Sequence, residues 1–355
     1  MQDRHPGCVC KGMMNKLISQ QRPATSDSSS RCHSTPSAFF GASLLVGLLL
    51  QAPPTLSQAA GVQLHPGDIV YVDSGNAIDG GFVVKVDAAT HEQTVISSGG
   101  NLQMPYGVVV DSNGQIVVSD AGRLIQIDPR TGTQTVLADN SGGKLGMPYG
   151  IDLDFSGQIV AANAQSIVRV DPGNGQTTVV SSGSNLRAPC GVAVADNGEL
   201  FVANLASGQI IRVNPQNGNQ KVIAFGGYLN SPRSIAVQGN DLYVTDVVNT
   251  NLNYGVMGRV IHIDAHTGAQ TLIAEGQNLV DPVGIAVDAT GQLIVGDPST
   301  VNPGSSDLAD GGYDGAIIAI DPASGLQTPI ARGQGGYVNP RGVAIVPNAA
   351  SATQH

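Results

Sequence analysis

The sequence Pro-x-Gly, or a close variant of it, occurs six times in the chain. The variable residue x of this motif is the best candidate for a chemical role. That residue is Arg341, Tyr106, Tyr149, Cys190, Arg233 or Val283. A guanidinium group can bind a carboxylate, phosphate or sulfate through paired N–H groups. A tyrosine ring can pack against a ring or sugar and still offer a hydroxyl. Arg341, Arg233, Tyr106, Tyr149 and Cys190 are therefore candidate ligand contacts; in the alternative, the arginines pair with the carboxylates that end the second strand of each repeat.

A second recurring set consists of the carboxylates and amides that end one strand-like run in each repeat. They are Asp73, Asp120, Asn163, Asn204, Asp246 and Asp297. A residue type that a repeat imposes carries little information about one site, so we expect these side chains to cap backbone N–H groups of a neighbouring loop. Asp73, Asp246 and Asp297 precede the longest connections, and they are also candidate ligand contacts.

One acidic segment has a composition that suits a metal ion. It contains Asp307, Asp310 and Asp314, separated by glycines and small residues. Calcium prefers several carboxylate and carbonyl oxygens, so calcium in the 297–315 loop is the only cofactor that the sequence suggests. The spacing is not that of an EF-hand, and a solvated acidic loop is the alternative.

Groups for acid–base or nucleophilic catalysis are scarce after residue 60. The histidines there are His65, His91, His262, His266 and His355. Their places in the repeats keep any three from meeting at one face, which argues against a histidine zinc site or a histidine acid–base pair. The sequence has no Gly-x-Ser-x-Gly elbow and no phosphate-binding loop. No catalytic residue is assigned.

The elements that position these residues belong to a repeat that is clearest in residues 105–138. Runs of Val and Ile alternate there with Asp-Ser-Asn-Gly, Asp-Ala-Gly and Asp-Pro-Arg-Thr-Gly turns, and similar text returns at Pro148, Pro189, Pro232 and Pro282. A period of about forty residues with four strands is typical of a β-propeller blade.

The two ends of the repeat region each hold an incomplete copy. Residues 68–97 supply three strands, and residues 340–346 supply a single first strand. Pairing the two fragments closes the ring and removes its free edges. The sequence therefore predicts an all-β, six-bladed propeller of four-stranded antiparallel blades, with the five complete blades at 105–138, 148–181, 189–224, 232–274 and 282–331.

The repeated text, Pro-x-Gly followed by alternating Val and Ile, Gly-x-Ile and a terminal Asp or Asn, resembles that of NHL-repeat propellers. It is also similar to the six-bladed group that contains regucalcin-type gluconolactonases, paraoxonases and strictosidine synthases. The resemblance covers residues 66–347. In the gluconolactonases it implies a carboxylate or Asn at the x position as a metal ligand, and no copy here has one. That departure favours binding over lactone hydrolysis.

Three connections between the second and third strands are long, at 73–81, 246–258 and 297–315. They belong to neighbouring blades of the closed ring, so we expect them to form a lip over one sector of the face on which they lie. Long loops in compact domains tend to be functional; drift of unconstrained surface loops is the alternative. Tyr254 and Tyr313 lie in this lip and are candidate ligand contacts.

The first 59 residues differ from the rest. Basic residues precede an apolar run from Ala38 to Leu50, which a small-x-small pattern follows at Ser57 to Ala59. This order predicts an export signal that is cleaved after Ala59, with an uncleaved membrane anchor as the alternative. The expected domains are a leader at 1–59, one propeller at 60–347 and a disordered tail at 348–355.

Charge and cysteine content restrict the partners. Five of the 17 Lys and Arg residues and two of the 27 Asp and Glu residues lie in the leader, so the remainder has 12 basic and 25 acidic residues, a formal charge of −13. This balance argues against nucleic acid and anionic membranes. Only Cys190 follows the leader, so no internal disulfide can form.

These features together indicate a secreted or periplasmic recognition module. We expect a monomer that binds a protein or a small, anionic ligand on the face that carries the variable loops. The alternative is an enzyme of the lactonase, lyase or strictosidine-synthase-like kind with an Arg, Tyr and Asp pocket. A structural component of the cell envelope is a third possibility, because one fold serves many functions.

Overall fold

A computed structural model of the chain describes residues 61–75, 80–249, 256–299, 315–332 and 339–348. The chain divides into two units, 1–57 and 58–355, and every described residue belongs to the second. The leader, Tyr254, Tyr313, the three aspartates of the calcium segment and the last seven residues lie outside the described ranges. Within those ranges, no helix is long and apolar enough to cross a membrane.

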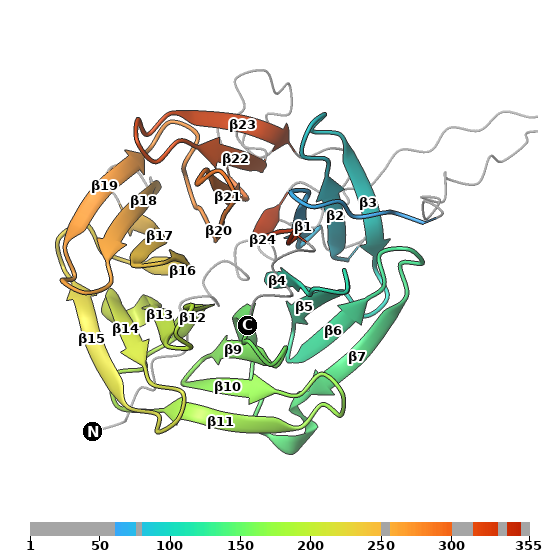
Figure 1. Cartoon of the computed structure of the whole chain (residues 1–355), viewed down its shortest axis with the longest axis horizontal. Coiled ribbons are helices and arrows are strands. Elements are labelled where there is room, and N and C mark those ends of the chain that lie inside the picture. Colours follow the sequence, from blue (N-terminus) through green and yellow to red (C-terminus); the bar gives the residue numbers. More distant parts are fainter. Residues whose placement is uncertain (1–60, 76–79, 250–255, 300–314, 333–338, 349–355) are drawn as a thin grey trace, which may run out of the picture. The chain divides into compact units, whose positions relative to one another are not determined.

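The described residues form six four-stranded antiparallel sheets around a common axis (Figure 1), which confirms the predicted six-bladed propeller. Blade 1 consists of β24 (Pro340–Ile345), β1 (Ile69–Asp73), β2 (Phe82–Val86) and β3 (Gln93–Ser98). Blade 2 consists of β4 (Gly107–Val110), β5 (Ile116–Asp120), β6 (Arg123–Ile127) and β7 (Gln134–Asp139), and blade 3 of β8 (Pro148–Leu153), β9 (Ile159–Asn163), β10 (Ser166–Val170) and β11 (Thr177–Ser182).

Blade 4 consists of β12 (Pro189–Val194), β13 (Leu200–Asn204), β14 (Gln209–Val213) and β15 (Gln220–Phe225). Blade 5 consists of β16 (Pro232–Gln238), β17 (Asp241–Asn249), β18 (Val256–Asp264) and β19 (Gln270–Glu275), and blade 6 of β20 (Gly284–Val287), β21 (Leu293–Asp297), β22 (Ala316–Ile320) and β23 (Gln327–Arg332). Two short 3-10 helices, η1 (Asn140–Gly142) and η2 (Leu205–Ser207), complete the described elements.

Ring closure occurs as the sequence predicts. The innermost strand of blade 1 is the C-terminal β24, which pairs antiparallel with β1 through Ile69↔Ile345, Val70↔Ala344 and Tyr71↔Val343. Two further backbone bonds, Gly67 N to Val346 O and Val346 N to Asp68 O, extend the pairing. Residues more than 270 positions apart therefore share one sheet, and no blade edge at the joint is left unpaired.

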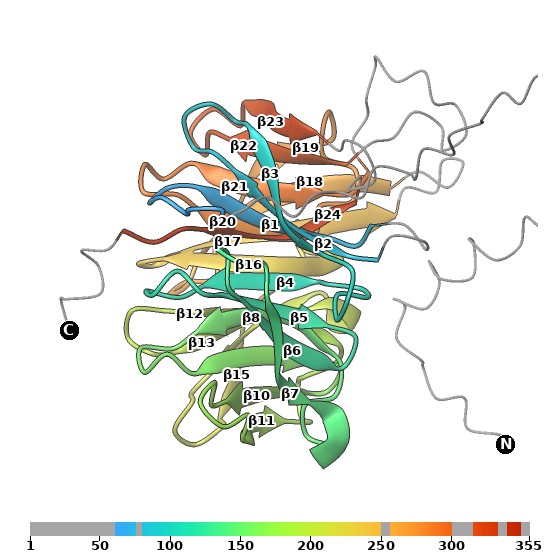
Figure 2. The same cartoon turned by 90° about the vertical axis from the view of Figure 1, so that its right-hand side faces the viewer.

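The apolar core lies between blades. Each of six clusters combines side chains of two adjacent blades; one, for example, joins Val160, Ile167 and their neighbours in blade 3 to Val202 and Ile211 in blade 4. Each blade therefore packs against two neighbours, and Figure 2 shows these stacked sheets from the side. Because the central strands of each blade are buried on both faces, they read as nearly continuous Val and Ile runs.

The glycine of Pro-x-Gly is needed where adjacent innermost strands approach most closely. A Cβ on Gly107 would lie 2.6 Å from the carbonyl oxygen of Tyr149, and one on Gly342 would lie 2.5 Å from that of Tyr106. Any side chain would therefore push two blades apart. In blade 5 the corresponding residue is Ser234, whose backbone N–H donates to Thr245 Oγ1 at 3.0 Å.

A glutamine at the start of the outermost strand joins each blade to the one before it, in every blade except blade 3. Gln134 Nε2 donates to Ser97 Oγ and Gly99 O, each at 3.0 Å, and Gln134 Oε1 accepts from Asn101 N at 2.6 Å. The glutamines at the same place in the other four blades are Gln93, Gln220, Gln270 and Gln327. Blade 3 has Thr177 there. The glutamine of the repeated Gln-Thr-Val text is thus an inter-blade contact.

Candidate functional site

The innermost strands of all six blades surround a central cavity of about 350 Å³. Each strand begins on the face that carries the connections between blades and between the second and third strands, which we call the top face. Tyr106, Cys190, Arg233 and Val283, four of the six variable residues of Pro-x-Gly, line the cavity. The motif therefore brings these side chains to the cavity, as its position in the repeat predicts.

Three of the variable residues form a stack at the cavity mouth. The rings of Tyr106 and Tyr149 meet edge to face, with centroids 5.1 Å apart and an interplanar angle of 75°. The Cζ atom of Arg341 lies 5.5 Å from the centroid of the Tyr106 ring. A guanidinium group over an aromatic face is attracted by the ring quadrupole, an interaction of about 0.5–2 kcal/mol. The stack thus fixes a cation beside two partly exposed rings.

The Nε atom of Arg341 is buried and has no hydrogen-bond partner among the described residues. A buried N–H without a partner is costly unless a ligand or water satisfies it. Arg341 therefore retains hydrogen-bonding capacity that the described part of the chain leaves unused.

The second arginine is held by an acid that the sequence analysis did not single out. Arg233 Nη2 lies 3.1 Å from Oδ1 of Asp281, a side chain that is only 5% exposed. Burial raises the pKa of Asp281, while the charges of Arg233 and Arg341 oppose that rise. Asp281 immediately precedes Pro282, where the other blades have Met, Ala, Ser or Asn; that departure was the available signal. Arg233 therefore pairs with a carboxylate of the chain, but not with one of the strand-end carboxylates that the alternative named.

Five of the six recurring carboxylates and amides accept from N–H groups of the connection that leads into the innermost strand of their own blade; Asn163 instead donates to Leu145 O at 3.0 Å. Asp120 Oδ2 accepts from the N–H groups of Gln103 and Met104, at 2.8 and 3.0 Å. Asn204 makes the equivalent bond to Arg187 N at 2.7 Å. The capping role predicted from the repeat is therefore confirmed for these positions.

The three members proposed as ligand contacts are fully buried. Asp73 accepts from Asn339 N and Gly75 N, each at 2.7 Å. Asp246 accepts from Asn230 N at 2.9 Å, and Asp297 from Val280 N at 2.7 Å. Each lies at 0% exposure beneath the connection it caps. The three aspartates therefore stabilise the connections that lead into the innermost strands. Direct contact between these aspartates and a ligand stays a prediction.

Burial changes the ionisation of two of these aspartates. It raises the pKa of Asp246 to about 6, against the N–H bonds of Asn230 and Ser231 and the charges of Arg259 and Arg233. It raises the pKa of Asp297 to about 7, against the N–H bonds of Ser299, Val280 and Asp281. Both carboxyls therefore titrate closer to neutral pH than an exposed aspartate.

The long connections are only partly described. In blade 5, the segment interpreted from sequence as a loop from Asp246 is instead a continuation of both strands: Val247 pairs with Gly258, Val248 with Met257 and Asn249 with Val256. The hairpin of β17 and β18 therefore extends beyond Asp246, because β-branched residues continue the strand. The parts of the predicted lip that hold Tyr254 and Tyr313 lie outside the described residues.

Two methionines flank the aromatic stack. The text Met-Pro-Tyr-Gly occurs twice, and Met104 and Met147 are 39% and 46% exposed. Cys190, in contrast, is fully buried in the cavity wall. Exposed methionines thus precede both tyrosines of the stack, and methionine is common on surfaces that adapt to a partner.

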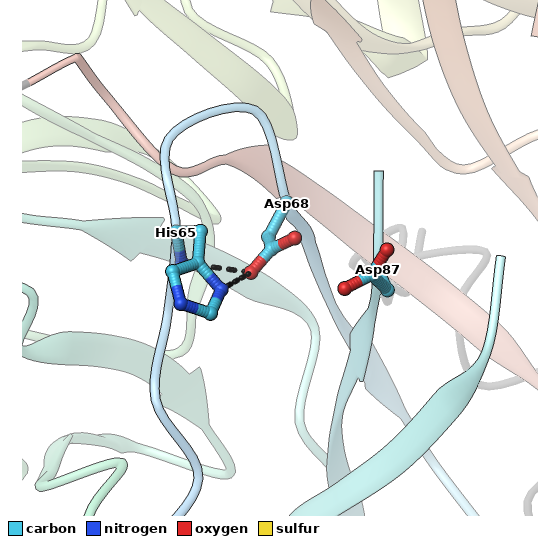
Figure 3. Close-up of side chains that lie close together, drawn as sticks. All are labelled: His65, Asp68 and Asp87. Carbon is cyan, nitrogen blue, oxygen red and sulfur yellow. Dashed lines mark hydrogen bonds and ion pairs between the residues drawn. The ribbon is translucent and has the colours of Figure 1, made fainter. Parts of the chain in front are cut away.

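A cluster of possible metal ligands lies at the start of blade 1. His65, Asp68 and Asp87 place ligand atoms within 4.8 Å of one another (Figure 3). Lys85 Nζ, however, lies 2.9 Å from Asp68 Oδ2 and 3.8 Å from Asp87 Oδ2, and it also donates to Gln63 O at 3.1 Å. The lysine already supplies the cation, so this cluster fastens the segment before β1 to its blade.

No protein-family model matches the chain, and no curated protein matches it. Among solved structures, a chain of the nidogen/laminin complex is similar, with a TM-score of 0.60 and 14% sequence identity; the match covers 78% of this chain and 97% of that chain. At this identity the likeness shows the propeller fold alone. The resemblance to NHL-repeat propellers stays a prediction.

Proposed function

We propose that this propeller is a recognition module whose top face binds a protein or a small anionic ligand. The observation that carries the proposal is the stack of Arg341 on Tyr106 at the mouth of the central cavity, with the Arg341 Nε–H buried and unsatisfied by the described residues. An anionic group at this partly exposed arginine side chain would form a charge-assisted bond.

The two arginines have different roles in this proposal. Arg233 is held by Asp281, so their charges compensate each other. Arg341 then supplies the net positive charge of the mouth, in a chain whose formal charge is −10. A local positive site on an acidic protein favours an anionic group and disfavours cationic partners at the same place.

The apolar part of the rim supports a protein partner. Tyr106 and Tyr149 lie beside the cation as partly exposed rings, and the exposed Met104 and Met147 precede them by two residues in the sequence. Tyr, Met and Arg are enriched at the centres of protein interfaces. The structural relative belongs to a protein complex, of nidogen with laminin, and this likeness of fold is consistent with a protein partner here.

The proposed setting is outside the cytoplasm. It rests on the pattern of the first 59 residues, in which an apolar run precedes a small-x-small sequence. A single cysteine after that segment is compatible with an oxidising compartment, because no mispaired disulfide can form within the chain. If the segment is not cleaved, the same propeller is attached to a membrane.

Two probes test the proposal, with Arg341→Ala as the key variant and Arg130→Ala as the control. Arg130 lies in a turn of blade 2, and its side chain is 75% exposed. Calorimetry with benzoate, which offers a carboxylate and a ring, should show binding that Arg341→Ala weakens roughly ten- to a hundredfold, since a hydrogen bond to a charged group contributes about 1.5–3 kcal/mol.

The protein arm uses immobilised wild-type, Arg341→Ala and Arg130→Ala propellers exposed to secreted proteins. We expect a protein that binds to the wild type and to Arg130→Ala, and that Arg341→Ala does not retain. The proposal is wrong if Arg130→Ala loses binding as strongly as Arg341→Ala. It is also wrong if Arg341→Ala changes neither the binding of benzoate nor the capture of a secreted protein.

A further inference from the structure

The wall of the central cavity contains one acidic residue that breaks the repeat. Asp152 occupies the second position after Pro-x-Gly in β8, where its backbone pairs with Val160. At the same register the other innermost strands have Val109, Ala193, Ala236, Ala286 and Ala344. A residue that departs from the repeat carries information about its own site, which a residue imposed by the repeat does not.

The carboxylate of Asp152 is anchored on both oxygens. Oδ1 accepts from the N–H of Leu153, and Oδ2 accepts from the N–H of Val194 in blade 4, each at 2.8 Å. A carboxylate oxygen has two acceptor sites, so each oxygen can take a further donor. Asp152 lines the cavity and is half-buried, which leaves those sites accessible from the cavity side.

The charge of Asp152 has no counter-ion in the described part of the chain. None of the ion pairs formed there includes it, and the side chains at the same register on the two neighbouring innermost strands, Val109 and Ala193, are apolar. The one described cationic side chain that lines the cavity, Arg233, is paired with Asp281 at the mouth. Burial raises the pKa of Asp152 to about 6, against the N–H bonds of Val194 and Leu153.

The depth of Asp152 restricts what can reach it. It lies three residues along β8 from Tyr149, roughly 10 Å from the top rim at about 3.3 Å per residue, and one residue before Leu153, where β8 ends. A ligand that enters from the top must therefore carry its charged group on a narrow stem, and the neighbouring Val109 and Ala193 can contact an apolar stem.

The geometry points to a second binding site in the cavity, in which Asp152 receives a primary ammonium group carried on an aliphatic chain. An ammonium group has three donors and no acceptor, so it matches a carboxylate whose remaining sites are acceptors. A lysine side chain of a partner protein and a free aliphatic amine share this chemistry. The site is separate from the Arg341 stack and does not depend on it.

The test uses n-butylammonium as the free amine, n-butanol as its uncharged counterpart, and a lysine-containing peptide beside the same peptide with norleucine. Backbone amide resonances of Leu153 and Val194 report binding, because both N–H groups donate to Asp152. We expect n-butylammonium to shift both resonances and n-butanol to shift neither. Binding of n-butylammonium should be at least tenfold weaker in Asp152→Asn, while the exposed-turn control Arg130→Ala should leave it unchanged.

Asp152→Ala provides a second variant, since four other blades have alanine at this register. It should bind n-butylammonium no better than Asp152→Asn. A stronger effect of the lysine peptide than of n-butylammonium assigns the site to a partner protein, and the reverse assigns it to a free amine. The inference is overturned if the wild type binds neither, if n-butanol binds as well as n-butylammonium, or if Asp152→Asn binds as well as the wild type.

Discussion

Replacing Asp297 with Asn should change how the stability of the propeller depends on pH. Asp297 is fully buried and accepts hydrogen bonds from the N–H groups of Val280, Asp281 and Ser299. Asn already occupies the equivalent position in blades 3 and 4, as Asn163 and Asn204. The variant should therefore fold, with some loss because an amide nitrogen cannot accept the bonds that one carboxylate oxygen accepts.

The direction in which the unfolding free energy changes with pH follows from the pKa of Asp297, which burial raises from 3.8 to about 7. Between these two values the folded state binds a proton that the unfolded state has released, so the free energy of unfolding falls as the pH rises. The destabilisation of the folded state by ionised Asp297 is absent below about pH 4 and complete above about pH 7. A shift of roughly three units corresponds to about 4 kcal/mol at most, at about 1.4 kcal/mol per unit.

Asn carries no charge at any pH, so Asp297→Asn should lose this part of the pH dependence. Urea unfolding at pH 5, 6, 7 and 8 measures it, as the difference in unfolding free energy between the wild type and the variant. We expect that difference to move by at most about 2.6 kcal/mol in favour of the variant between pH 5 and pH 8. Asp288→Asn, in a turn at the opposite end of blade 6, is the control. Equal pH dependence in the wild type and Asp297→Asn would refute the reasoning.

Two further predictions concern the joints of the ring. Removing residues 340–355 should abolish cooperative unfolding, because β24 supplies the innermost strand of blade 1; a truncated protein that melts within a few degrees of the intact one would contradict this. Gln134→Leu should lower the free energy of unfolding by about 1–3 kcal/mol through its three lost bonds to blade 1. The exposed Gln238→Leu is the matched control, and equal urea midpoints for the two variants would count against the inter-blade role.

The fold was predictable because each repeat contains the same local sequence patterns for turns and strands. Each blade carries its own turn residues and its own strand-length Val and Ile runs, so the strands of one blade can be read without reference to another. The split blade was also readable, since 340–346 begins a repeat and 68–97 lacks that beginning. The capping role of Asp120 and Asn204 followed from the same regularity. All of these are contacts that the repeat itself specifies.

The candidate site was predictable only in its outline. The Pro-x-Gly sequence predicted that Tyr106 lies at the cavity, because the first residues of the innermost strands face the axis, and Arg341 and Tyr149 contact its ring. The edge-to-face stack and the position of Arg341 over Tyr106 depend on how far adjacent blades are rotated, which no local pattern specifies. The continuation of β17 and β18 beyond Asp246 also depends on pairing, and the sequence alone suggested a loop there.

The sequence by itself therefore determined the number of blades, the closure of the ring and the residues that begin each innermost strand. Only the tertiary structure decided that Asp281 pairs with Arg233, 48 residues away, and that Asp152 is a lone carboxylate in an apolar cavity wall. The physical reason is that a repeat fixes contacts within a blade, whereas the electrostatics of the central cavity arise where side chains from all six blades converge.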